Sequence, residues 1–333
     1  MPYEASNISH QYDLIVPSGD YELKIIKDSD LPAAAKLKLL PVTRTQFFRH
    51  LCSKVELAKI FKKQQILSPA FEFVENYDDL GYLAEKLGYP VLLKIDYSGG
   101  GAGTFKLNHS GDILNIPTAF RGETLLLQKF IEGRLFDMSG FYQDGKLIHF
   151  SCSEFLEVPT NPFGPSILKV FNKGASSKGR VILELSSIGR ALGLHGFTNV
   201  GFIESSQDGK RYYFEVDVRP NDWINYPSYY GDDPAINIKN YLTKKLFLRP
   251  SDANESIDEI YLFANPSRLN FYELITNKYC WITYSSFYSL SMHKLSLFIF
   301  NPIEKFKILM VQYVKPKISN EIWAAAKNLL SKM

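Results

Sequence analysis

The spacing of apolar residues switches between a helical and a strand period along the first part of the chain. Phe47, Leu51 and Val55 recur at helical spacing, and Ser68-Pro69 ends that segment. The expected elements are helices over 46–65 and 77–87, and strands over 12–16, 70–74, 91–95, 104–107 and 124–130. From residue 54 to residue 130 they predict a compact α+β lobe.

Turn signals and alternating patterns predict two β-hairpins in the next part of the chain. The first turns at Asp144-Gly145, a pair typical of two-residue hairpin loops. The expected elements are strands over 135–142, 146–151, 199–205 and 212–218, and an amphipathic helix over 181–194. Residues 161–178, rich in proline and glycine, are expected to form a loop.

Composition is that of an ordinary globular protein. A length of 333 residues predicts two or three lobes, and a net charge of +3 is too small to indicate nucleic acid. Cys52, Cys152 and Cys280 have no metal-ligand spacing and form no disulfide framework, which favours a reducing cytoplasm. The sequence shows neither a signal-peptide pattern nor a run long enough to span a membrane.

The last part of the chain, residues 249–333, is rich in aromatic residues without a clear period. An ordinary core is the favoured interpretation, because aromatic residues more often fill interiors than bind partners. A third small lobe, the surface of a homodimer and a membrane-proximal patch are the alternatives.

One lysine stands inside an apolar strand and is followed by a glycine-rich loop. Lys94 lies within Val91–Ile95, and Ser98-Gly99-Gly100-Gly101-Ala102-Gly103 follows. Glycines let backbone N–H groups approach and converge on an anion, so the pair suits a nucleotide triphosphate. The order differs from a Walker P-loop, where the lysine follows the glycines, and no dinucleotide fingerprint is present. A surface hairpin with a solvated lysine is the alternative.

A second group of polar residues follows one predicted strand. Glu215, Asp217 and Arg219 alternate with Phe214, Val216 and Val218, so the period of two places the charged residues on one face. Neighbouring carboxylates repel unless a cation lies between them, and Mg²⁺ binds such oxygens together with phosphates. Arg219 can hold a phosphoryl oxygen. A solvated strand face is the alternative.

In the order and spacing of these motifs, residues 50–245 resemble the ATP-grasp superfamily. The resemblance rests on Lys54, on Tyr89–Lys94 with its glycine loop, on Leu127–Gly133 and on Phe214–Pro220. It implies an α+β fold in which two lobes clamp the nucleotide. The implied organisation is a shortened N-terminal α/β segment (1–53), a small lobe (54–130), a large lobe with the metal site (131–248) and a C-terminal extension (249–333).

The resemblance also implies a role for each matching residue. Lys54 and Lys94 match lysines on the α- and β-phosphates, and Ser98 to Gly103 match a lid. The adenine hinge matches Gln128, Lys129, Phe130 and Ile131, and Glu132 or Asp137 is expected to bind the ribose. Glu215 and Asp217 match metal ligands, Arg219 matches the catalytic arginine near the γ-phosphate, and Lys94 is the second catalytic candidate.

Two departures from the family pattern concern the metal site. Asp217 stands where asparagine is usual, and Gly201 stands where a further metal ligand is often found. Glu204 on the same strand is the candidate replacement, with a water molecule as the alternative. The metal is expected to be Mg²⁺, with Mn²⁺ as the alternative, and the number of ions is left open.

The implied activity is an ATP-dependent ligation of a small-molecule carboxylate to an amine, through an acyl phosphate that releases ADP and phosphate. The alternatives are a phosphotransferase on the same core and a non-catalytic nucleotide-binding protein. Neither a nucleic acid nor a membrane is expected as a partner. The basic residues around 169–180 and the segment Asn221–Trp223 are candidates for the acceptor site, and His195 is expected to be structural.

Overall fold

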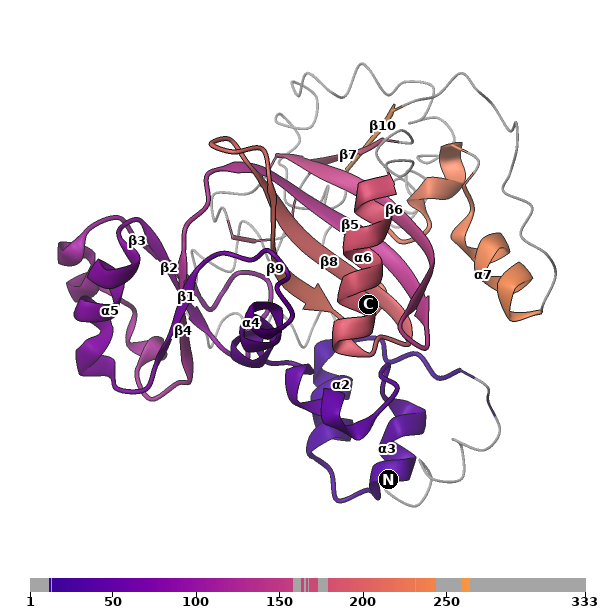
Figure 1. Cartoon of the computed structure of the whole chain (residues 1–333), viewed down its shortest axis with the longest axis horizontal. Coiled ribbons are helices and arrows are strands. Elements are labelled where there is room, and N and C mark those ends of the chain that lie inside the picture. The colour runs from indigo at the N-terminus through magenta and orange to yellow at the C-terminus, as the bar shows by residue number, and fades with distance from the viewer. Residues whose placement is uncertain are drawn as a thin grey trace, which may run out of the picture. The chain divides into compact units, whose positions relative to one another are not determined.

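The computed structural model describes residues 12, 14–157, 163, 164, 166, 168–172, 179–230, 232–243 and 259–263 (Figure 1). Contacts divide the chain into two compact units, Met1–Ala264 and Asn265–Met333. The second unit lies outside the described residues, and with it most of the aromatic-rich extension. No helix among the described residues is long and apolar enough to span a membrane.

Helices rather than a strand form the N-terminal segment. The strand expected over 12–16 is absent where the structure describes that stretch, and helix α2 (Asp20–Asp28) begins just after it. Acidic residues in the first turn of α2 and Lys27 in its last turn complement the helix dipole. Helices α3 (Ala33–Leu39) and η1 (Thr45–His50) follow.

The helix expected over 46–65 is two helices with a break between them. After η1 the chain turns at Cys52, whose φ of 59° is in the left-handed region, and α4 (Lys54–Lys63) then begins. Ser53 caps α4, because its Oγ accepts a hydrogen bond from the Glu56 backbone N–H at 3.1 Å. The break brings the N-terminus of α4 to the site described below.

The small lobe is a four-stranded antiparallel sheet in the order β1-β4-β2-β3. Its strands are β1 (Phe71–Val74), β2 (Val91–Ile95), β3 (Thr104–Leu107) and β4 (Leu125–Lys129). Helix η2 (Tyr77–Asp79) leads into α5 (Leu80–Leu87), which packs on the sheet (Figure 1), and helices η3 (Ser110–Asn115) and η4 (Thr118–Phe120) connect β3 to β4. Leu93, Leu107 and Leu127 are fully buried in the core of this lobe.

The large lobe is a six-stranded sheet in the order β10-β7-β6-β5-β8-β9. Its strands are β5 (Gly133–Gln143), β6 (Lys146–Glu157), β7 (Leu168–Asn172), β8 (Gly196–Ser205), β9 (Arg211–Asp217) and β10 (Glu259–Phe263). Helix α6 (Gly179–Leu192) lies across this sheet (Figure 1), and η6 (Tyr226–Tyr230) and α7 (Pro234–Leu242) follow β9. All described strand pairs are antiparallel, and the predicted α+β class is confirmed.

Two parts of the large sheet differ from the prediction. Strand β7 lies inside 161–178, where only a loop was expected. Strand β10 pairs with β7 and carries the sheet to Phe263, past the boundary expected at residue 248. Strand β7 pairs with β6 and β10, which lie elsewhere in the chain, and the short sequence of each strand does not by itself indicate this pairing.

Candidate active site

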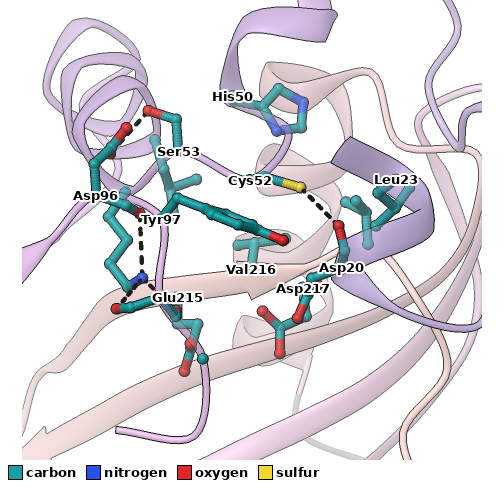
Figure 2. Close-up of a pocket in the computed structure, with 15 residues that line it drawn as sticks. Asp20, Leu23, His50, Cys52, Ser53, Asp96, Tyr97, Glu215, Val216 and Asp217 are labelled. Atoms are coloured by element: carbon teal, nitrogen blue, oxygen red, sulfur yellow. Dashed lines mark hydrogen bonds between the residues drawn. The ribbon is translucent and has the colours of Figure 1, made fainter. Parts of the chain in front are cut away.

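A cavity of about 270 Å³ lies where α2, the N-terminus of α4, the loop after β2 and the end of β9 meet (Figure 2). Its charged lining consists of Asp20, Lys54, Asp96, Glu215 and Asp217. Four of these side chains are carboxylates and one is an amine. The cavity therefore combines the two kinds of group that a metal–phosphate complex requires.

Lys54 connects the start of α4 to the glycine-rich loop. Its Nζ donates to the backbone oxygens of Ser98 at 2.7 Å and Asp96 at 3.2 Å, and lies 3.2 Å from the Ser98 Oγ. The Asp96 carboxylate accepts from the Ser53 hydroxyl at 3.0 Å and from the Val55 N–H at 2.8 Å. Burial lowers the pKa of Lys54, although Glu215 acts in the opposite direction.

Lys94 lies deeper than Lys54, between the strands of the small lobe. Its side chain is 7% exposed, and its Nζ donates to the Gln128 Oε1 at 2.8 Å. The amine also lies 5.1 Å from the ring centroid of Phe214, a cation–π contact between the two lobes. Burial lowers the pKa of Lys94 to about 8. The ammonium is therefore poorly solvated, with one neutral oxygen as its direct partner among the described residues.

The glycine-rich loop contacts both lobes. Ser98 and Gly99 line the cavity, and Gly100 and Gly101 have φ values of 60° and 77°. A Cβ at Gly101 would collide with the backbone of Phe163, and a Cβ at Gly103 would collide with the Ser98 side chain. These close approaches require glycine. The loop borders the cavity at the place where the sequence predicted a lid.

The predicted adenine hinge is the end of β4 and the residues after it. The Gln128 side chain is 3% exposed and binds Lys94. Lys129 Nζ donates to the Gly88 and Tyr89 oxygens at 2.6 and 3.2 Å, and Lys106 lies 3.8 Å from the Phe130 ring centroid. Ile131 is half-buried and Glu132 is exposed. Adenine binding by this segment stays a prediction.

Asp137 does not line the cavity, and its expected ribose contact stays a prediction. Its side chain is buried on β5, where the Lys169 Nζ donates to its Oδ2 at 2.5 Å and Ser153 donates to its Oδ1. The Lys169 ammonium lies 3.9 Å from the ring of Phe155 and 3.7 Å from the ring of Trp223. Asp137 thus balances a buried lysine. Nothing in the sequence signals this pair, because its members are on different strands.

The end of β9 carries the predicted metal ligands and arginine. Gly201 and Asn199 of β8 lie opposite Glu215 and Asp217. Burial and the neighbouring charge of Glu215 raise the pKa of Asp217 well above its usual range. Arg219 donates from Nη2 to the Asp217 Oδ2 at 3.4 Å. The three charged residues therefore lie together, as the period of the strand predicted.

Phe214, however, is on the other side of β9 from the one predicted. The register shifts between Gly201 and Phe202, which pair with Glu215 and Tyr213, so Phe214 is the extra residue of a β-bulge. Tyr213 enters the core in its place. A Cβ built on Gly201 would come within 3.0 Å of the Phe214 ring, so the ring occupies the space that a longer side chain at Gly201 would need.

Glu204 does not replace a metal ligand in this structure. It lies opposite Arg211 at the far end of β8 from Asn199, and Arg134 donates from Nη2 to its carboxylate and from Nη1 to Glu154 at 3.3 Å. The expectation that Glu204 joins Glu215 is therefore wrong. Glu204 is three positions along the strand from Gly201, which is about 10 Å of chain.

The donor set at the end of β9 fits one divalent cation. Glu215 has no hydrogen bond or ion pair to another described residue, and it lies beside Asp217, whose pKa is raised by burial and by the charge of Glu215. Hard carboxylate oxygens suit Mg²⁺, which completes its shell with water and phosphate. Within the described residues, no group of three or more Asp, Glu, His or Cys residues could hold a metal without such help.

The other candidates for chemistry have structural partners. The Asn221 amide nitrogen donates to Ser139 Oγ at 2.6 Å and to Asn199 Oδ1 at 2.9 Å. Arg180 pairs with Glu184 at 3.0 Å. The His195 Nδ1 accepts from the Asp144 N–H at 3.3 Å, in agreement with its expected structural role. Of the basic residues near 161–178, Lys173 and Lys178 lie outside the described residues.

Comparison with known proteins shows sequence similarity to a large enzyme. No family model matches the chain. The carbamoyl phosphate synthase large chain of Clostridium botulinum (strain Eklund 17B / Type B) is 26% identical over 162 residues, which are 46% of this chain and 15% of that protein. The chain thus corresponds to only a small part of this relative.

Solved structures show the same fold at low sequence identity. The biotin carboxylase domain of Hydrogenobacter thermophilus 2-oxoglutarate carboxylase, in complex with MgADP, ADP and bicarbonate, superposes with a TM-score of 0.56 at 16% identity. The match covers 75% of this chain and 58% of that one. N5-carboxyaminoimidazole synthetase from Staphylococcus aureus, in complex with ADP, gives 0.54 at 14% identity, over 68% and 58%. The chain therefore has the ATP-grasp fold that its resemblance to this superfamily implied.

Sequence reasoning missed two charged residues of the site, Asp20 and Asp96. Asp20, the first residue of α2, lines the cavity beside Asp217 (Figure 2) and binds Arg219. The acidic first turn of α2 is visible in the sequence, but its partner is 199 residues away. A pattern within a single element cannot reveal such a contact.

Proposed function

We propose that this chain is an ATP-dependent ligase that activates a carboxylate as an acyl phosphate and joins it to an amine. The observation that carries the proposal is the meeting of Lys54 with Glu215 and Asp217 across one cavity, in a fold shared with ligases and carboxylases that bind ADP. The amine and the carboxylates come from different elements, the N-terminus of α4 and the end of β9, so a nucleotide between them would be held from both sides.

In the proposed reaction, a carboxylate oxygen of the substrate attacks the γ-phosphorus of ATP, and the bond to the ADP oxygen breaks. An amine then attacks the acyl carbon, phosphate leaves with the bonding electrons, and the amine loses a proton. Phosphoryl transfer of this kind depends on positioning and charge neutralisation more than on a protein nucleophile.

The residues of the cavity divide this work with Lys94 and Arg219, which do not line the cavity but lie next to it. Lys54 and Lys94 hold the α- and β-phosphates, and the loop Ser98–Gly103 covers them and excludes water. Glu215 and Asp217 would hold Mg²⁺, which supplies charge neutralisation at the phosphates when bound. Arg219 contacts the γ-phosphoryl group as it moves to the carboxylate. Mn²⁺ is the alternative metal.

The substrates are proposed only as chemical classes, a small carboxylate and an amine. Bicarbonate deserves a place among the carboxylates tested, because the solved carboxylase domain that this chain resembles was crystallised with bicarbonate. A homodimer is a further proposal, since that domain forms a dimer. The free thiols of Cys52 and Cys152 are consistent with the predicted cytoplasmic location.

Hydroxylamine trapping tests the proposed function. The protein is incubated with ATP, Mg²⁺, hydroxylamine and a panel of carboxylates, and hydroxamate and ADP are measured together. The proposal predicts hydroxamate in proportion to ADP for at least one carboxylate; for bicarbonate, the readout is bicarbonate-dependent ADP release. Release of AMP and pyrophosphate would contradict it.

One observation favours a second function, a nucleotide-binding protein without turnover. The Phe214 ring occupies the space beside Gly201, so that position supplies no side chain to a metal. If this loss removes catalysis, the protein will bind ATP with Mg²⁺ but release no ADP with any carboxylate. The two functions are distinguished by measuring ADP formation and ATP binding on the same sample.

A further inference from the structure

We propose that Asp20 of helix α2 is a positioning residue for Arg219, so that the N-terminal segment forms part of the active site. This inference rests on the proposed function, because the task of Arg219 is itself proposed. The N-terminal segment, expected to be only a shortened domain before the two lobes, would then help to orient a residue of the active site.

The contact between the two side chains is a two-point ion pair. Arg219 Nε donates to Asp20 Oδ1 at 2.9 Å, and Arg219 Nη2 donates to Asp20 Oδ2 at 2.9 Å. Such parallel hydrogen bonds fix the plane of the guanidinium group as well as its position. The remaining hydrogen of Nη2 faces the Asp217 Oδ2 at 3.4 Å. Asp20 therefore determines how Arg219 is oriented beside the metal-binding carboxylates.

This arrangement leaves one side of the guanidinium group available. Of its five N–H donors, Asp20 engages two and Asp217 one. Nη1 makes no hydrogen bond to another described residue. With the Nε–Nη2 edge held by Asp20, the two hydrogens of Nη1 are the donors that can bind a phosphoryl oxygen.

Asp20 is held in place by contacts that do not involve Arg219. Leu23, one turn along α2, is 1% exposed and belongs to the main core of the large lobe. Lys27 Nζ donates to the Leu51 oxygen at 2.8 Å, and the Cys52 thiol lies 3.5 Å from the Asp20 backbone oxygen (Figure 2). Since the helix is anchored in the core, its first residue acts as a fixed support rather than as a gate.

The ion pair is too exposed for stability to be its main effect. The Arg219 and Asp20 side chains are 25% and 36% exposed, and ion pairs near solvent contribute little to stability. Neutralising Asp20 should therefore leave the fold intact while the guanidinium group loses its orientation. That separation makes the inference testable.

The experiment compares Asp20→Asn with Glu22→Gln in the full chain. Glu22 is exposed in the same first turn, so its variant matches the change in charge and in the helix dipole without touching Arg219. We expect Asp20→Asn to lower kcat by roughly 10- to 100-fold, as for a small misplacement of a reacting group. Glu22→Gln should stay within about 2-fold of wild type, since it lies outside the site.

Two further readouts separate positioning from a structural role. ADP carries no γ-phosphate for Arg219 to bind, so ADP affinity by calorimetry and Tm should be unchanged in Asp20→Asn. Since the two residues act as a unit, Asp20→Asn should change kcat by less than about 2-fold in an Arg219→Ala background. An unchanged kcat in Asp20→Asn, or full additivity with Arg219→Ala, would overturn the inference. Tighter ATP binding at unchanged kcat would show that Asp20 competes with phosphate instead.

The test also holds if wild type shows no turnover, in which case the proposed ligase fails separately. The readout is then the ratio of ATP to ADP affinity, measured with Mg²⁺. Positioning predicts that wild type prefers ATP and that Asp20→Asn loses this preference while Glu22→Gln keeps it. A preference that survives in Asp20→Asn, or no preference in wild type, would reject the role of Asp20.

Discussion

Replacing Lys94 by methionine should remove activity without destabilising the protein appreciably. Burial lowers the pKa of Lys94 from 10.5 to about 8. Because each pKa unit corresponds to about 1.4 kcal/mol, holding the ammonium in this site costs about 3 kcal/mol at pH 7. Methionine has a similar length and no charge, so the substitution relieves that cost.

Two losses oppose this gain. The Gln128 Oε1, which accepts from Lys94 at 2.8 Å, is left without its partner inside the lobe, at a cost of about 1–3 kcal/mol. The cation–π contact with Phe214 contributes up to about 2 kcal/mol more. The opposing terms nearly cancel, so Lys94→Met should change the free energy of unfolding by less than about 2 kcal/mol.

Lys169→Met is the matched control. Lys169 is fully buried and its pKa is also lowered to about 8, but its partner is the Asp137 carboxylate at 2.5 Å. Removing this lysine leaves an unpaired buried carboxylate, which costs about 3–5 kcal/mol. Urea unfolding at pH 7, followed by circular dichroism, gives both stabilities, and ATP-dependent ADP release gives the activity. Equal destabilisation by the two substitutions, or normal turnover in Lys94→Met, would refute the reasoning.

The remaining predictions concern pH, the glycine loop and the metal. Burial lowers the pKa of His50 to about 4, so the imidazole takes up a proton in the unfolded chain before it does so in the folded protein as the pH falls from 6.5 to 4. The stability that depends on the neutral imidazole is therefore complete above pH 6.5. It is lost as the pH falls from 6.5 to 4, by up to about 3 kcal/mol. Urea midpoints between pH 4 and pH 7 should therefore change less in His50→Gln than in wild type, and parallel curves would contradict this. Gly101→Ala should lower ATP turnover about tenfold or more, because the φ of Gly101 is 77° and the new Cβ would collide with the Phe163 backbone. Gly99→Ala has open space around its Cβ, so its turnover should stay within about threefold of wild type. Equal rates for the two variants would remove the loop from the mechanism. Glu215→Gln should raise the Mg²⁺ concentration needed for half-maximal ATP binding about tenfold or more. Glu204→Gln should leave that concentration unchanged, since Glu204 binds Arg134. A higher Mg²⁺ requirement in Glu204→Gln and not in Glu215→Gln would contradict the assignment of the metal ligand.

Local patterns predicted much of the fold because most elements carry their own signals. The apolar run Val91–Ile95 and the Asp144-Gly145 turn each specify a strand or a hairpin within a few residues. The break in the helix over 46–65 was missed because Cys52 adopts a left-handed φ. Residues other than glycine rarely adopt this conformation, so nothing in the sequence indicates a turn there. Strand β7 was missed because its pairing depends on β6 and β10.

The site was predictable where its residues alternate on one strand and unpredictable where it depends on tertiary contacts. Glu215, Asp217 and Arg219 share a face, as their spacing requires. The bulge at Phe214 shifts the register by one residue, and no feature of the strand itself reveals it. By their positions in the sequence, Asp137 was a candidate for ribose binding and Glu204 for metal binding. In the structure the buried Lys169 binds Asp137, and Arg134 binds Glu204. Asp20 became visible only through its contact with Arg219.

The central claim is that nucleotide phosphates bind in the cavity between Lys54 and Glu215. A crystal structure with Mg²⁺ and a non-hydrolysable ATP analogue tests this claim most directly. The phosphates should lie in the cavity of about 270 Å³, with Lys54 on one side and Glu215 and Asp217, which would hold the metal, on the other. A nucleotide bound elsewhere, or one whose phosphates point away from these residues, would contradict the account.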